Sequence, residues 1–77
     1  MTLDDRVTTD PEVCHGQPCI RGTRIMVALI LEWLEAGETH ESILEAYPSL
    51  TEEDIRGAIR YARKIIALER TGSYVPA

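Results

Sequence analysis

The sequence predicts a mainly α-helical fold, in which three helices follow a short N-terminal β arm. Three observations support this prediction: a run of helix-forming residues at 27–36, apolar residues at spacings of three and four within 55–66, and β-branched residues flanked by turn formers within 7–25. A chain of 77 residues has room for one domain. We place the β arm at about 7–25, the helical body at about 26–70 and a loose tail at 71–77.

The arm is predicted to contain two short strands, at 7–9 and 19–25. Turn-forming residues at 10–11 and 16–18 mark the connection between them. Gly22 is free to take a positive φ, which only glycine adopts without steric cost. A two-stranded arm alone is marginal in water, so it must pack on the helices or pair with another copy.

The first helix is predicted at 27–36, with Gly37 as its C-terminal cap. A helix that is apolar almost all round is either central to the fold or shared with a partner subunit. Trp33 lies within it, and core packing or a dimer interface explains this ring better than stacking on nucleic acid. Because a core of this size is marginal, we predict a homodimer with candidate interface residues Trp33, Ile30 and Leu34.

Two further helices are predicted from their caps and their apolar spacing. Thr39 can cap a short second helix, which Pro48 ends. The third helix begins after Thr51, because Thr51 and Asp54 form a pattern that resembles a capping box. Its apolar stripe predicts that it continues to about residue 70.

Charge and composition limit the classes of function. With 13 acidic and 8 basic residues the net charge is −5, so the molecule as a whole should repel nucleic acid. The sequence starts without a signal-peptide pattern, and its longest apolar run, 25–31, is too short for a membrane span. We therefore expect a cytoplasmic protein that does not contact membranes, in which Cys14 and Cys19 are reduced, structural thiols.

Residue spacing disfavours catalysis and metal binding. Cys14, His15, Cys19 and His40 are of ligand and nucleophile types, but their spacing matches no zinc-finger pattern. A nucleophilic cysteine also needs an electropositive pocket, which an acidic arm hardly provides. We predict that the protein is not an enzyme, with no catalytic residue, no metal or cofactor and no small-molecule substrate.

The best candidate for nucleic-acid contact is a basic arc on the third helix, away from its apolar stripe, made of Arg56, Arg60, Arg63 and Lys64. A solvated helix face explains the same residues, with Glu52 and Arg56 as an i, i+4 pair. A recognition helix reads bases with its first turn, and here that turn holds three carboxylates. Any DNA contact is therefore expected from the middle of the helix, or from Arg21 and Arg24 on the arm. For Arg24 we favour a structural ion pair or carbonyl cap.

Residues 16–25 read Gly-Gln-Pro-Cys-Ile-Arg-Gly-Thr-Arg-Ile, and this spaced pattern resembles the family called domain of unknown function 433. The resemblance extends over about residues 7–70. It implies a helix-turn-helix-like body of the homeodomain or winged-helix kind. It also implies an antitoxin-like protein that neutralises a cognate toxin, such as an RNase of the PIN-like type, and that regulates its own operon by binding DNA. Two alternatives stay open: a DNA-binding regulator without a toxin, and a homodimeric interaction module with neither activity.

Overall fold

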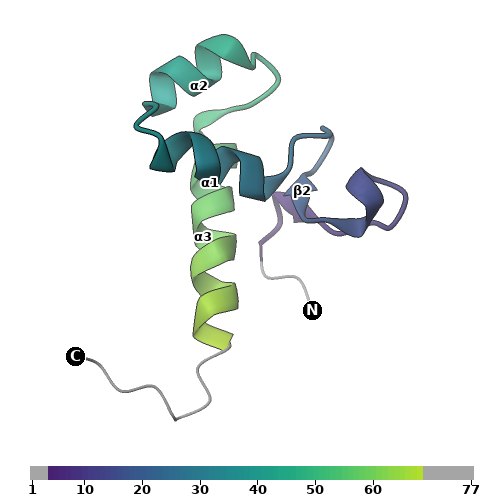
Figure 1. Cartoon of the computed structure of the whole chain (residues 1–77). Helices are drawn as coiled ribbons and strands as arrows, with labels where there is room; N and C mark the ends of the chain where they lie inside the picture. The colour runs from purple at the N-terminus through teal and green to yellow at the C-terminus, as the bar shows by residue number, and fades with distance from the viewer. Residues whose placement is uncertain (1–3, 69–77) are drawn as a thin grey trace, which may run out of the picture.

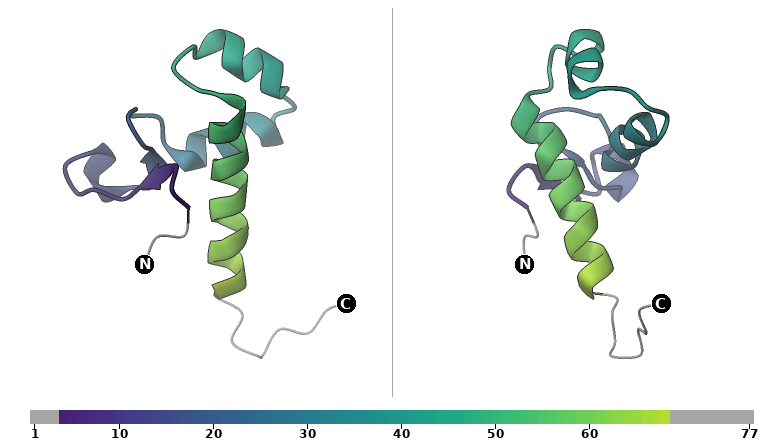
Figure 2. Two further views of the ribbon diagram at one scale, coloured as in Figure 1. Left: turned by 180° about the vertical axis from the view of Figure 1, so that it is seen from behind. Right: turned by 90° about the vertical axis from the view of Figure 1, so that its left-hand side faces the viewer.

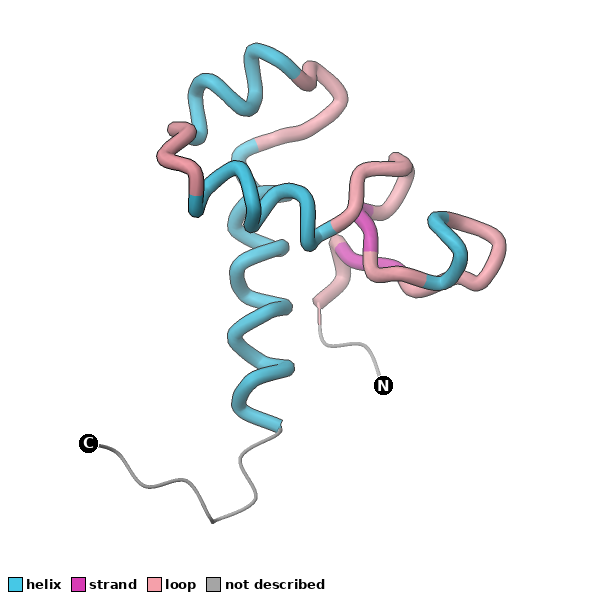
Figure 3. Tube along the Cα trace, in the orientation of Figure 1, coloured by secondary structure: helices cyan, strands magenta, loops and turns pink. Residues whose placement is uncertain are grey.

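The computed structural model describes residues 4–68, which form three helices and a two-stranded antiparallel sheet (Figures 1 and 3). The predicted mainly helical fold with an N-terminal β arm is confirmed. The predicted tail and the predicted helix end near residue 70 lie outside the described residues. The elements in chain order are β1 (Val7–Thr8), a 3-10 turn η1 (Cys14–Gly16), β2 (Cys19–Ile20), α1 (Val27–Glu35), α2 (His40–Ala46) and α3 (Glu52–Leu68).

The two strands of the arm are shorter than predicted, because the chain reverses direction soon after β2 begins. Val7 pairs with Ile20 in the antiparallel ladder of β1 and β2. Gly22, at φ +83°, lets the chain turn, and the N–H of Thr23 donates to the carbonyl of Ile20 at 2.9 Å. The N–H of Ile20 then donates to the carbonyl of Ile25 at 2.9 Å. Residues predicted as the continuation of β2 therefore fold back against it.

The turn η1 holds two residues in a conformation that the sequence did not predict. Cys14 and His15 have φ values of +53° and +56°, in the left-handed region that costs a residue with a side chain about 1 kcal/mol or more. The chain leaves this turn through a hydrogen bond from the N–H of Gln17 to the carbonyl of Cys14 at 3.0 Å. The arm is therefore a compact, tightly turned unit.

The end of α1 and the starts of α2 and α3 lie at the residues whose capping chemistry predicts them. After α1, the N–H of Glu38 donates to the carbonyl of Trp33 at 3.0 Å while Gly37 takes a φ of +96°, as in a Schellman motif. The Thr39 side chain caps α2 in a capping box. At α3 the N–H of Thr51 donates to Asp54 Oδ2 at 2.9 Å, and the N–H of Asp54 donates to Thr51 Oγ1 at 3.2 Å. Aspartate is thus long enough to complete this box.

The core lies where α1 crosses α3, with the arm packed against α1 and the first half of α3. Ile30 of α1 and Ile55 of α3 are fully buried at this crossing. α2 lies at the end where α3 begins, and the C-terminal turns of α3 extend past the other elements (Figures 1 and 2). Within residues 4–68, no helix has both the length and the apolarity needed to cross a bilayer.

The arm approaches α3 closely at Gly57, a glycine in the middle of a helix. A Cβ at this position would lie 3.0 Å from Asp4 Oδ1 and 3.2 Å from Arg6 Cβ. Glycine costs about 1 kcal/mol relative to alanine inside a helix. Its presence is explained by the space that the arm needs, and this contact brings the charged residues of the arm against those of α3.

Candidate functional site

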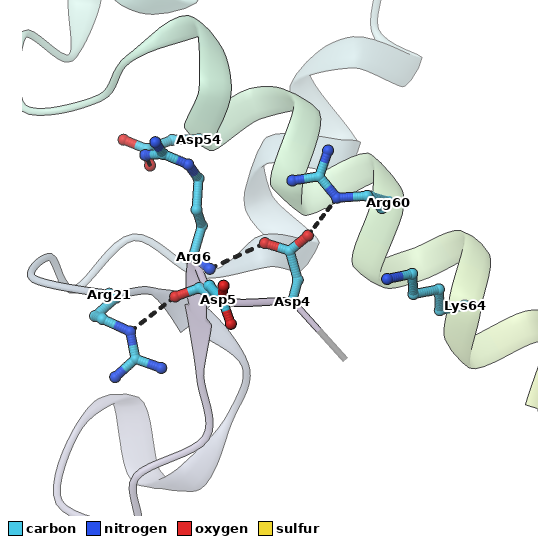
Figure 4. Close-up of a pocket in the computed structure, with 7 residues that line it drawn as sticks. All are labelled: Asp4, Asp5, Arg6, Arg21, Asp54, Arg60 and Lys64. Carbon is cyan, nitrogen blue, oxygen red and sulfur yellow. Dashed lines mark hydrogen bonds and ion pairs between the residues drawn. The ribbon is translucent and has the colours of Figure 1, made fainter. Parts of the chain in front are cut away.

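Charged side chains from the arm and α3 converge in a hollow of about 650 Å³ (Figure 4). Arg60 Nε donates to Asp4 Oδ2 at 2.5 Å, and Arg6 Nη1 donates to Asp54 Oδ1 at 3.0 Å. These contacts join residues that are 56 and 48 positions apart in the chain. We call these two ion pairs the arm lock, because they hold the N-terminal segment against α3. The hollow is lined by Asp4, Asp5, Arg6, Arg21, Asp54, Arg60 and Lys64.

Asp4 is the most buried carboxylate of the arm lock, with a side chain only 3% exposed. Burial by itself raises the pKa of Asp4. The hydrogen bonds from Arg60 and from the backbone N–H of Arg6, with the positive charges of Arg60 and Lys64, outweigh this effect and lower the pKa of Asp4 below its ordinary value. Asp4 therefore stays ionised at neutral pH and is already neutralised by basic residues of its own chain.

Acidification is expected to weaken the arm lock. Because the pKa of Asp4 is lower in the folded than in the unfolded chain, its stabilisation is complete above the unfolded pKa, about 4, and is lost as pH falls through the folded pKa. Asp4→Asn should lower the free energy of unfolding by on the order of 1 kcal/mol at pH 7 and by less at pH 3. Urea unfolding followed by circular dichroism at both pH values measures this difference. Asp5→Asn, at an exposed neighbour, is the matched control.

The residues of the predicted basic arc differ in their surroundings: some form ion pairs within the chain, and others are exposed. Arg60 is held by Asp4, and Lys64 lines the same hollow. Arg56 Nε contacts Glu52 Oε2 at 3.3 Å, the i, i+4 pair expected of a solvated face, and its side chain is 63% exposed. Arg63 is exposed. Nucleic-acid binding by the arc stays a prediction, and Arg56 and Arg60 already have carboxylate partners.

The two arginines of the arm differ in their surroundings. Arg21 Nε donates to the backbone carbonyl of Asp5 at 2.9 Å. Arg21 therefore makes the carbonyl contact that we favoured for Arg24. Arg24 is exposed and, with Arg21, lines a shallow hollow on the arm. Contact of either residue with nucleic acid stays a prediction.

The cysteines of the arm are free thiols that make structural contacts. Cys14 Sγ donates to the carbonyl of Arg24 at 3.3 Å. Burial and the neighbouring Cys14 raise the pKa of Cys19 to about 11, so its thiol is protonated and unreactive at neutral pH. Among residues 4–68, histidine, cysteine and carboxylate side chains form no group of three or more that could hold a metal ion.

The residues predicted for a dimer interface are used by the core of the chain itself. Ile30 is fully buried in the core of its own chain, so its burial needs no partner, and an interface role for it stays a prediction. Trp33 and Leu34 are partly buried and pack against the same core. Large exposed apolar residues occur on α3 instead, namely Ile59, Ile66 and Leu68, with exposures of 41%, 63% and 59%. Ile59 and Ile66 belong to the predicted apolar stripe, whose periodicity did not show where the core ends.

Trp33 also belongs to an aromatic pair that the sequence did not predict. Its ring stacks on that of Tyr47, with centroids 4.4 Å apart and planes inclined by 18°. The pair borders a groove of about 220 Å³, which we call the aromatic groove; it is lined by Trp33, Glu38, Ser42, Ile43, Ala46 and Tyr47. Glu38 Oε1 accepts a hydrogen bond from Ser42 Oγ at 2.7 Å, and this contact places a carboxylate in the groove wall.

The aromatic groove lies in the most acidic part of the chain. Residues 25–55 contain eight of the 13 acidic residues and none of the eight lysines and arginines. We call the exposed carboxylates of α1, α2 and their connection the acidic pole; they are Glu32, Glu35, Glu38, Glu41 and Glu45. This signal is present in the sequence, but the net charge of the whole chain does not show where the acidic residues lie.

Comparisons with known proteins agree with the fold. The family model described as protein of unknown function (DUF433) matches residues 7–62. The chain is 45% identical over 56 residues to a protein described as uncharacterized protein y4eO, from Sinorhizobium fredii (strain NBRC 101917 / NGR234), a match that covers 73% of this chain and 25% of that protein. A crystal structure of a DUF433 member from Anabaena variabilis ATCC 29413 is similar, with a TM-score of 0.76 and 33% identity, over 86% of this chain and 65% of that one. The chain thus spans a quarter of the length of the rhizobial relative. The matched pattern, the helical body and its β arm together show that this chain belongs to the DUF433 family.

Proposed function

We propose that the chain is an antitoxin-like binding protein, which neutralises a basic cognate toxin by covering its nucleic-acid-binding face. The observation that supports this most is the acidic pole, an exposed surface without lysine or arginine on the elements that form it. A nuclease, including one of the PIN-like type, must bind phosphates and therefore presents a positive face. An acidic protein surface competes for that face by the same electrostatics that attract the substrate.

Electrostatics favour this function over DNA binding by the chain alone. The first turn of α3, which a recognition helix would present to bases, carries Glu52, Glu53 and Asp54. Arg60 is engaged by Asp4, so its charge is already compensated. The exposed Arg63 is the best candidate on α3 for phosphate contact in autoregulation, and we expect such binding to be weak and strongly dependent on salt.

The second part of the proposal is self-association, in which a second copy of the chain binds the C-terminal half of α3. This half presents Ile66 and Leu68 to solvent. Two copies of α3 in antiparallel contact through this half would cover Ile66 and Leu68 of each copy with the same face of the other. Such a contact about a two-fold axis uses the same face of both copies and closes as a dimer.

The function can be tested by co-expression with the product of the neighbouring reading frame in a bacterial host. We expect the neighbour alone to arrest growth and the wild-type chain to restore it. A variant with Glu35, Glu41 and Glu45 changed to Gln should restore growth poorly, because it loses three charges of the acidic pole. A chain with Asp5, Asp10 and Glu12 changed to Asn, Asn and Gln is the matched control, which loses three exposed charges from the arm. A neighbour without toxicity, or equal rescue by both variants, would contradict the proposal.

A further inference from the structure

The aromatic groove combines an exposed ring, a carboxylate and a negative field, and each of these features favours the binding of a cationic side chain. Tyr47 keeps 38% of its surface exposed while its ring is supported by the stacked Trp33. Ile43 and Ala46 give the groove an apolar wall, and Glu38 gives it a charged one. We infer that this groove binds an arginine side chain from a basic segment of a partner protein.

Guanidinium chemistry fits the arrangement of groups. A guanidinium stacks on an aromatic face, where the negative quadrupole of the ring attracts it. Its N–H groups can then donate to the Glu38 carboxylate, which the Ser42 hydroxyl already orients through Oε1. The aliphatic stem of arginine packs on apolar surface, such as that of Ala46. A carboxylate or a phosphate would be repelled by the same wall.

The surrounding charges indicate a polypeptide with several basic residues as the occupant. Glu41 and Glu45 lie on α2, a seven-residue helix about 10 Å long, so both are within about one Debye length of the groove. Glu32 and Glu35 lie on α1, the helix that carries Trp33. A single cation would use only part of this field, whereas a segment with several arginines would engage it along its length.

This inference rests on the proposed function, because it names the contact surface and the partner chemistry of the same acidic pole. The test uses a synthetic peptide as the partner, so that the groove assignment and the proposed antitoxin function can fail separately. Trp33 is the only tryptophan of the chain, so intrinsic tryptophan fluorescence reports on the groove itself. The probe is a short peptide with four arginines in a glycine and serine background, and its control replaces arginine with citrulline, a neutral residue of the same shape.

We expect the arginine peptide to change Trp33 fluorescence saturably, and the citrulline peptide to leave it unchanged. Glu38→Gln should weaken binding about fivefold, because the neutral amide keeps the Ser42 contact but loses the ionic one. Glu12→Gln is the control, because it removes the same charge from an exposed residue of the arm that does not line the groove. It should weaken binding less than twofold. Tyr47→Leu should weaken binding about fivefold, with the helical circular-dichroism signal checking that it folds.

Three results would overturn the inference. Equal binding of the citrulline peptide would show that charge is not recognised. Equal effects of Glu38→Gln and Glu12→Gln would show that only the net charge of the molecule attracts the peptide. A change of Trp33 fluorescence on dilution of the chain alone would show that a second copy occupies the groove. Loss of growth rescue with intact peptide binding would instead remove the toxin as partner and leave the groove assignment in place.

Discussion

Replacing Ile30 with alanine is expected to lower the free energy of unfolding by about 3 kcal/mol, because the side chain is fully buried and the cavity left behind cannot fill with other atoms. A core of this size rarely supplies more than about 3 to 5 kcal/mol, so much of the variant should be unfolded at 25 °C. Urea unfolding monitored by circular dichroism measures the change. At concentrations where the chain is monomeric, this loss of unfolding free energy should not depend on protein concentration, because Ile30 packs inside its own chain.

Ile66→Ala is the matched control for this prediction. Ile66 is 63% exposed on α3, so its truncation should change the unfolding free energy of the monomer by less than about 0.5 kcal/mol. It should instead weaken self-association in sedimentation equilibrium, if the second copy docks on this face. A loss for Ile30→Ala that disappears at high protein concentration would place Ile30 at an interface.

The local structure of this chain follows from its sequence because the determinants are close together. Gly37 ends α1 through a hydrogen bond spanning five residues, and Thr51 and Asp54 begin α3 through contacts three residues apart. Such signals depend on backbone chemistry alone, which explains why the helices begin and end close to the predicted positions. The left-handed Cys14 escaped prediction, since residues with side chains rarely adopt this conformation.

The surfaces that distinguish the candidate functions depend on contacts between distant residues. The sequence placed Arg60 on the outer face of a helix, which is correct, but its partner Asp4 lies 56 residues away. Helical periodicity cannot show that the arm reaches this face. The stacking of Trp33 on Tyr47 likewise depends on the relative placement of α1 and α2, which the pattern of either helix does not carry. The acidic pole is different, because its charges are adjacent in the sequence and a window over residues 25–55 detects it.

Asp54 has two structural roles, so its replacement by alanine should be the second most damaging change. Its Oδ2 accepts from the N–H of Thr51 at the start of α3, and its Oδ1 accepts from Arg6 Nη1 in the arm lock. Asp54→Ala removes a helix cap worth about 1 kcal/mol and an ion pair that we value at about 1 kcal/mol, because the Arg6 side chain is 43% exposed to solvent. We therefore expect a loss of about 2 kcal/mol in urea unfolding at pH 7.

A double-mutant cycle separates the two roles of Asp54. Arg6→Ala removes the ion pair and leaves the capping box intact, so the coupling energy between Arg6 and Asp54 isolates the contribution of this one ion pair of the arm lock, expected at about 1 kcal/mol. Glu53→Ala is the control, because it removes a negative charge from the same helical turn at an exposed position and should cost less than about 0.5 kcal/mol. If Asp54→Ala is no more harmful than Glu53→Ala, neither the cap nor the ion pair stabilises the fold. In that case the arm would be held to α3 by Val7 and Ile20 of the apolar core.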